Sequence, residues 1–241
     1  MPALDDHPLR YTLNSELHAR PFPSLTAPHV AAYLAVRPLG EAARRDRSVD
    51  LQQLRDLLAH YGAPLPAEDA THYFGPMGKY TLKWEQHTEF VTYTVFLDQL
   101  GQRPFDPAEF DVFPQDWRAG LNAQRITSIL LRLVPRPPQD AQIADTLQDW
   151  FVPESLAVAS VLEDAAVIAS DFRIDPAGHM RMAVFASEGT GSRRLGRIVQ
   201  RLCEIETYKS MSMLGFAKVR EFAGQLDRID AELNDLMAGM A

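Results

Sequence analysis

The segment from Ser192 to the C-terminal residue constrains the fold more strongly than any other part of the chain. Ser192 follows a loop with Gly189 and Gly191 and is a natural N-cap, so we predict that a helix starts here. The second half of the segment repeats apolar residues at alternating intervals of four and three, the pattern of a coiled coil. These residues, called the seam below, are Phe222, Leu226, Ile229, Leu233, Leu236 and Met240.

Polar residues such as Gln225, Asp230 and Glu232 flank the seam. A helix that packs on a globular core usually has a wider apolar face. We therefore predict that the seam pairs with another copy of the chain and produces a homo-oligomer. The seam is still running where the sequence stops, so we expect a longer protein in which this helical stem continues.

Charge and cysteine content narrow the class of protein. The 241 residues include 32 acidic and 24 basic side chains, a net charge of −8. This charge disfavours nucleic acid as a partner, because phosphate binding needs a basic surface. The single cysteine, Cys203, excludes an intramolecular disulfide and fits a reducing compartment such as the cytoplasm. The sequence lacks a signal peptide and an apolar run of roughly 20 residues, so we expect it to be soluble.

Strand and helix patterns alternate through the middle of the chain. Strands are predicted at 29–37, 126–134, 155–162, 165–174 and 179–186, and helices at 48–61 and 139–150. Residues 80–97 are too long for one ordinary strand and are predicted to fold back near Gln86–Thr88. The expected fold class is α+β, with a mostly antiparallel sheet, helices on one face and a long C-terminal helix.

The predicted organisation has three parts. An irregular arm covers residues 1–28, the α+β head covers 29–190, and the helical stem covers 191–241. Within the head, residues 29–98 and 126–187 both follow the order strand, helix, strand, strand, and the second half adds one more strand. This order indicates two β-α-β-β-like halves, which arose by duplication or by chance recurrence of short helices between hairpins.

Two groups of alternating polar residues are candidates for a ligand site. Side chains two apart on an extended segment face the same way. The first group could bind an anion or support acid–base chemistry, or it could simply tie the arm to the sheet. The second could bind a metal on a continuous strand, although a hairpin near residue 87 would break it up. The groups are Asn14, Glu16, His18 and Arg20, and Lys83, Glu85, His87 and Glu89.

A third candidate lies at the start of the C-terminal helix. Arg193, Arg197 and Arg201 are four apart and share one stripe of the helix. Together with the free N–H groups after Gly191 they could bind a phosphate or carboxylate. The alternative is a solvated basic face that pairs with acidic neighbours such as Glu204 or with another subunit.

Three phrases of the sequence resemble one bacterial family across essentially the whole chain. They are Asn14-Ser15-Glu16-Leu17-His18-Ala19-Arg20-Pro21, Leu82-Lys83-Trp84-Glu85-Gln86-His87-Thr88-Glu89-Phe90, and Arg194-Leu195-Gly196-Arg197-Ile198-Val199-Gln200-Arg201-Leu202 followed by Glu204-Ile205-Glu206-Thr207-Tyr208. The family is that of uncharacterised membrane-anchored proteins with domain of unknown function 3422. The resemblance implies a helical stem that continues into hydrophobic membrane segments near the C-terminus, and it implies no catalytic residues.

The expected function is therefore that of a non-enzymatic head, a scaffold or sensor that acts through protein contacts. We expect it on the cytoplasmic face of the bacterial inner membrane, attached by a C-terminal anchor outside this sequence. No recognisable catalytic motif, metal site or cofactor motif is present in the sequence. The alternative is a head that binds a small molecule or anion, and that could be an enzyme, through the polar groups named above.

Overall fold

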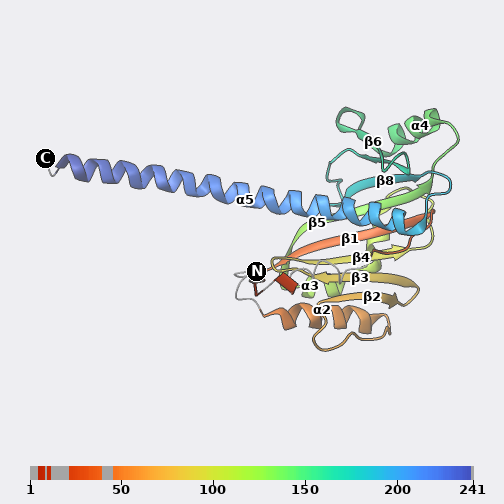
Figure 1. Ribbon diagram of the computed structural model, residues 1–241, viewed down its shortest axis with the longest axis horizontal. Helices are drawn as coiled ribbons and strands as arrows, with labels where there is room; N and C mark the ends of the chain where they lie inside the picture. Colours follow the sequence, from red (N-terminus) through yellow and green to blue (C-terminus); the bar gives the residue numbers. More distant parts are fainter. Residues whose placement is uncertain (1–4, 9, 12–21, 40–45, 240–241) are drawn as a thin grey trace.

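The computed structural model describes residues 5–8, 10, 11, 22–39 and 46–239, and it has the elements labelled in Figure 1. The strands are β1 (His29–Pro38), β2 (His72–Met77), β3 (Tyr80–Gln86), β4 (Val91–Leu97), β5 (Ala123–Pro135), β6 (Ala157–Val161), β7 (Ala166–Ser170) and β8 (Met180–Ala186). The helices are α2 (Arg47–His60), η2 (Pro107–Val112), α3 (Gln115–Gly120), α4 (Asp140–Trp150), η3 (Pro153–Ser155) and α5 (Ser192–Gly239).

The strands form one eight-stranded sheet in the order β2-β3-β4-β1-β5-β8-β7-β6. Every neighbouring pair is antiparallel except β5 and β8, which are parallel. The central pair, β1 and β5, joins the two halves of the chain. The predicted α+β class with a mostly antiparallel sheet and a long C-terminal helix is confirmed.

Each half of the chain contains three strands after its helix; the extra strand of the second half was predicted, whereas that of the first half, β2, was not. Strand β2 was missed in the sequence because Gly75 and Pro76 fall within it, and both residues are unfavourable in strands. Both halves thus read strand, helix and three strands. In both halves the last strand pairs with the first, but β1 and β4 are antiparallel whereas β5 and β8 are parallel. The halves share an order of elements but differ in strand polarity, and duplication stays a prediction.

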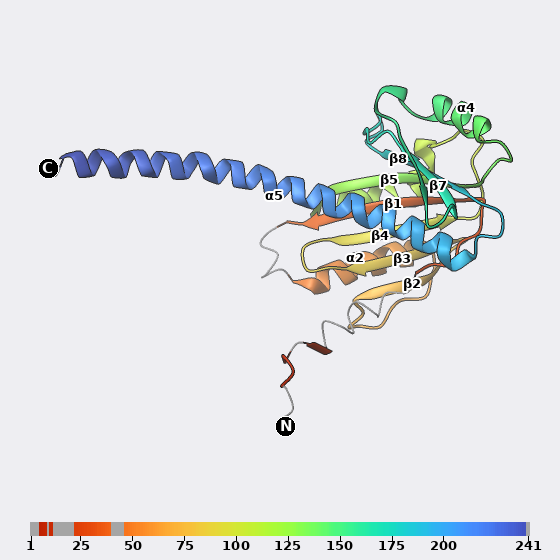
Figure 2. The same cartoon turned by 45° about the horizontal axis from the view of Figure 1, so that its top comes forward.

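The sheet buries both of its faces. The short helices α2 and α4, with residues of η2, pack on one face, as predicted, and contribute Leu54, Leu57 and Phe110 to the larger core. The other face is covered by the first part of α5, which contributes Leu195, Val199 and similar residues to a second core. The prediction did not place this helix on the sheet. Figures 1 and 2 show α5 crossing the sheet and then projecting beyond it.

Local signals for turns and caps were partly misread. The chain does fold back between β3 and β4, but the turn comprises residues 87–90, with a hydrogen bond from the His87 N–H to the Phe90 carbonyl (2.9 Å). Helix α2, predicted to begin at residue 48, begins at Arg47 and is capped by Asp46, whose carboxylate accepts the N–H of Ser48 at 2.9 Å. Helix α5 does begin at Ser192, but the carbonyl of Gly191 accepts the N–H of Leu195 (3.1 Å), so Gly191 holds the cap position.

Residues 22–28 form a short strap that fixes the start of α5. The Leu25 N–H donates to the carbonyl of Ser192 at 3.1 Å. One turn further along, Pro23 crosses so close to Gly196 that a Cβ at this position would overlap the Pro23 carbonyl oxygen. Glycine is therefore required at residue 196, even though glycine in a helix interior is ordinarily unfavourable.

This close approach generates a first prediction. Gly196→Ala should lower the free energy of unfolding by about 1–3 kcal/mol, because the new methyl group forces the strap away from α5. Gly224→Ala is the matched control, since a Cβ there meets no atom within 4 Å. The control should be neutral or stabilising by up to about 1 kcal/mol. Urea unfolding of both variants makes the comparison, and equal effects would contradict the role given to the strap.

Candidate functional site

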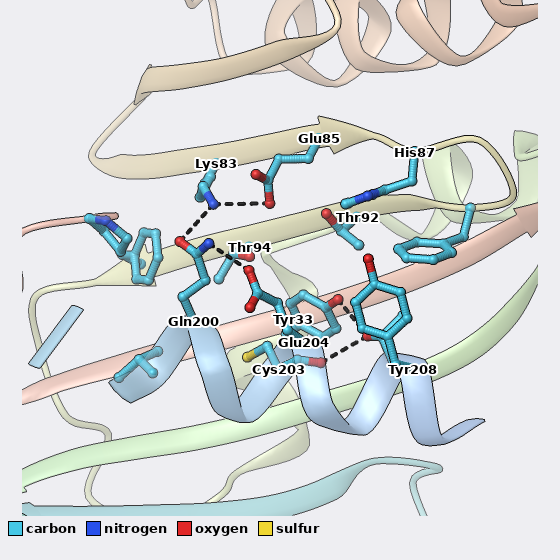
Figure 3. Close-up of a pocket in the computed structure, with 15 residues that line it drawn as sticks. Tyr33, Lys83, Glu85, His87, Thr92, Thr94, Gln200, Cys203, Glu204 and Tyr208 are labelled. Atoms are coloured by element: carbon cyan, nitrogen blue, oxygen red, sulfur yellow. Dashed lines mark hydrogen bonds and ion pairs between the residues drawn. The ribbon is translucent and has the colours of Figure 1, made fainter. Parts of the chain in front are cut away.

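A cluster of polar side chains lies between the sheet and α5, where the surrounding contacts are otherwise apolar. Because side chains alternate along a strand, Leu82 and Trp84 of β3 enter the larger core while Lys83 and Glu85 face α5. The neighbouring strand β4 presents Thr92 and Thr94 to the same space, since these residues pair with Glu85 and Lys83. Figure 3 shows this layer from the side of the cavity.

The charged part of the cluster links β3 to α5. The Lys83 Nζ lies 2.9 Å from the Glu85 Oε2 and donates to the Gln200 Oε1 at 2.8 Å. The Gln200 Nε2 in turn donates to the Glu204 Oε1 at 2.7 Å. Lys83 is 4% exposed and Glu85 is 7% exposed, so this ion pair is almost fully removed from water. Through these contacts Lys83 joins strand β3 to α5.

The hydroxyl part of the cluster has no acid–base capacity near neutral pH. The Tyr33 hydroxyl is 2.6 Å from the Thr207 Oγ1, which donates to the Cys203 carbonyl at 2.9 Å. Burial raises the pKa of Tyr33 well above its ordinary value. Burial also raises the pKa of the Cys203 thiol, with the nearby Glu204 carboxylate adding to the shift. Cys203 is therefore a protonated, buried thiol rather than a nucleophile.

The space left inside the cluster is small. A cavity of about 20 Å³ remains among these residues, at the contact of β1, β3 and β4 with α5. This volume is enough for about one water molecule. The arrangement thus matches an internal polar contact more closely than a substrate pocket, which usually measures several hundred Å³.

The turn between β3 and β4 separates Glu89 from the other three residues of the second predicted group. Lys83, Glu85 and His87 all line the cavity, and the His87 ring stacks on Phe90 with 4.3 Å between centroids. Glu89 lies exposed in the turn and does not line the cavity. The described residues contain no group of three His, Cys, Asp or Glu side chains that could hold a metal ion. Ligand binding by Lys83, Glu85 or His87 stays a prediction.

The first predicted group, Asn14, Glu16, His18 and Arg20, lies outside the described residues. The described chain resumes at Phe22, whose ring lies 4.8 Å from the Arg197 guanidinium. Pro23 then lines the cavity beside α5. The strap therefore enters the fold at the edge of the polar cluster.

The arginine stripe is exposed on the outer side of α5. Arg201 is paired with Glu204 at 3.3 Å, and Arg197 packs against Phe22 as described above. Arg193 borders an open hollow that also contains the acidic residues Glu163, Asp164 and Glu188. The hollow is lined by three carboxylates and two arginines, Arg193 and Arg194, and this mixed charge makes it less suited to a phosphate or carboxylate ligand than a purely basic site would be. Anion binding at the stripe stays a prediction.

A second buried polar cluster, on the opposite face of the sheet, was missed in the sequence. The Nδ1 of His179 is 3.0 Å from the Ser128 Oγ, and its ring lies 4.2 Å from the Phe110 ring. The Ser128 hydroxyl donates to the Gly178 carbonyl at 3.0 Å. Burial lowers the pKa of His179 from its ordinary value of 6.5. The imidazole of the native state therefore stays neutral at a pH somewhat below 6.5. The sequence offered no signal for this contact, because it joins residues of β5 and the β7–β8 connection.

The family is settled by a comparison with known sequences. The family model described as Protein of unknown function (DUF3422) matches residues 5–241. The chain belongs to this family. No curated protein and no solved structure matches the chain.

Membership of DUF3422 brings no functional residues to the site, because the family has no assigned function. Among the helices that the structure describes, none is both long enough and apolar enough to cross a membrane. The evidence for the role of the chain is therefore the contacts and exposed surfaces of its own described residues.

The pKa of His179 generates a prediction about pH. Below pH about 6.5 this histidine becomes protonated in the unfolded chain but stays neutral in the native state. The free energy of unfolding should therefore fall as the pH drops. The fall should end once the pH is below the native pKa. Relative to wild type, His179→Asn should flatten the profile between pH 7 and pH 5, whereas His72→Asn at an exposed strand position should not. Unchanged slopes would contradict the buried neutral imidazole.

The Lys83–Glu85 pair generates a prediction about stability. Lys83→Met should destabilise the chain by about 3–5 kcal/mol, because it leaves the Glu85 carboxylate buried without its cation. Lys83→Met with Glu85→Gln should be less destabilising than Lys83→Met alone. Lys79→Met, an exposed lysine, is the control. Urea unfolding of the wild type, Lys83→Met, Glu85→Gln, the double variant and the control measures the coupling, and simple additivity of the two buried changes would contradict a direct pair.

Proposed function

We propose that this chain is a non-enzymatic assembly head that acts through protein contacts and self-associates through α5. The observation that carries the proposal is the exposure of the seam. Phe222, Leu226, Ile229, Leu233 and Leu236 are 56%, 62%, 57%, 55% and 65% exposed, respectively. Met240, the last residue of the predicted seam, lies outside the described residues.

The exposed seam is energetically costly for a helix that stays alone. Burial of one such side chain contributes roughly 1.5–3 kcal/mol before the entropy of association is counted. From residue 212 to residue 239 every described side chain of α5 is exposed, and this part projects away from the sheet by roughly 40 Å (Figure 2). The described residues of the head do not cover the seam, so another polypeptide is the expected partner.

The seam lies on a side of α5 that a partner helix can reach. With roughly 100° of rotation per residue, Leu226 and Leu233 lie on the same side of the helix as Arg197 and Tyr208. Both of those residues are exposed, although Tyr208 also makes an edge contact with Phe90 beside the cavity, and Val199 on the opposite side of the helix is buried against the sheet. A second helix can therefore pack along the seam without meeting the sheet of its own copy.

The alternative function, a head that binds a small molecule or anion, has less support. The cavity beside Lys83 and Glu85 has room for about one water molecule, and its described polar groups contact one another. The hollow beside Arg193 is lined by carboxylates as well as arginines. Both observations favour the assembly head.

Attachment to the cytoplasmic face of a bacterial inner membrane is a further part of the proposal. Its support is the resemblance to membrane-anchored proteins, in which hydrophobic segments follow the helical stem. Fractionation of cells that express the full-length gene product tests it, and recovery of the protein outside the membrane fraction would contradict it.

Self-association is tested by changing the seam without changing the head. Leu226→Asp with Leu233→Asp should convert an oligomer to a monomer, because each copy would bury two carboxylates. Ala217→Asp with Ala231→Asp adds the same charge at exposed positions on the opposite side of α5 and should leave the oligomer intact. Light scattering over a concentration series measures the mass, and circular dichroism checks that the head stays folded. A monomeric wild-type chain at high concentration would overturn the proposal.

A further inference from the structure

The seam extends further toward the head than the sequence indicated. Continued backward at the same intervals, it passes through Val219, Gly215, Ser212, Tyr208 and Ile205. Val219, Tyr208 and Ile205 are 64%, 54% and 64% exposed. Ile205 and Tyr208 belong to the part of α5 whose opposite side is buried on the sheet. The exposed stripe therefore runs from Ile205 to Leu236, more than four heptads.

Resting on the proposed function, we propose that the partner of α5 is the α5 of a second copy, running antiparallel. In this arrangement Ile205 of one copy faces Leu236 of the other, and Val219 faces Phe222 near the two-fold axis. The paired helices would use the whole exposed stripe of both copies. Three properties of α5 favour this direction over a parallel pair.

The first property is the size of the side chains along the stripe. Ser212 and Gly215 are consecutive small residues in it. A parallel pair would place each small residue opposite itself and leave a gap in two adjacent layers, which is costly in a packed interface. The antiparallel pair places Ser212 opposite Ile229 and Gly215 opposite Leu226, so that small residues face large ones.

The second property is the distribution of charge along α5. Residues 221–239 carry five acidic side chains and one basic side chain. A parallel pair would set this acidic segment beside its own copy, where like charges repel. The antiparallel pair sets it beside residues 202–220, which carry three basic and two acidic side chains. Asp230 then flanks the stripe near Lys209 of the partner.

The third property is the free path along the head. Ile205 lies on the outer side of α5, opposite the face that contributes Val199 and Cys203 to the second core. Figure 1 shows α5 on the outside of the sheet along its first turns. The end of a partner helix can therefore lie over the exposed Ile205, beside Tyr208, whose ring makes an edge contact with Phe90 at 5.6 Å between centroids. The paired segment ends at Arg201, where the stripe changes from apolar to basic.

Disulfide trapping in the full chain tests the direction. Ile205→Cys with Leu236→Cys in one chain should form a crosslinked dimer under mild oxidation, because the two positions face each other across the antiparallel pair. Each single variant should stay largely uncrosslinked, because its cysteines are then separated by roughly 45 Å. The native Cys203 is buried and should not contribute. Ala217→Cys with Ala231→Cys, on the opposite side of α5, is the matched control and should not crosslink.

The outcomes separate the inference from the proposed function. Rapid crosslinking of Ile205→Cys alone and of Leu236→Cys alone would show a parallel pair, and would overturn the inference while self-association stands. A monomeric mass for the wild-type chain by light scattering would overturn both. A dimeric mass with crosslinking of the double variant at least tenfold faster than that of either single variant supports the antiparallel pair.

Discussion

The contact between the first turns of α5 and the sheet is the interaction on which the rest of the structure depends. It buries the face of the sheet that the short helices leave open and supplies the second core. It also orients the helix, because Lys83 and Gln200 join it to β3 and Gly196 lets the strap cross it closely. A helix held at one end by both apolar and polar contacts leaves the head in a defined direction, and its exposed stripe then faces away from the sheet.

Much of the fold could be predicted from the sequence because its signals are local. Enrichment in Val, Tyr and Leu identified β1, a strand-sized apolar run identified β5, and helical periodicity identified α2 and α4. Strand β2 could not be found in this way, since Pro76 and Gly75 oppose strand formation and the strand is stabilised by pairing with β3 and by burial of Met77 in the larger core. The packing of α5 on the sheet also depends on contacts far apart in the sequence, which periodicity does not reveal.

The candidate site likewise has one part that local sequence signals predict and another part that depends on contacts between distant residues. Lys83 and Glu85 could be placed on one face of β3 from their spacing alone, and the structure brings them to 2.9 Å. Their partner Gln200 follows 117 residues after Lys83, and nothing in the local pattern of either segment points to the other. The spacing of Gln200 and Glu204, four apart beside the buried residues of α5, was the available signal. Sequence reasoning thus found the charged pair but not the helix that contacts it.

The direction of pairing has a consequence for how the heads would be presented. A parallel pair would hold both heads at one end of an upright stem, with both C-terminal ends together at the other. An antiparallel pair separates the heads and places the end of each α5 beside the head of the partner. If a membrane anchor follows α5, the antiparallel pair would lie along the membrane surface with a head near each anchor. The acidic segment 221–239 would then be held against the partner helix, which reduces its repulsion from an anionic lipid surface.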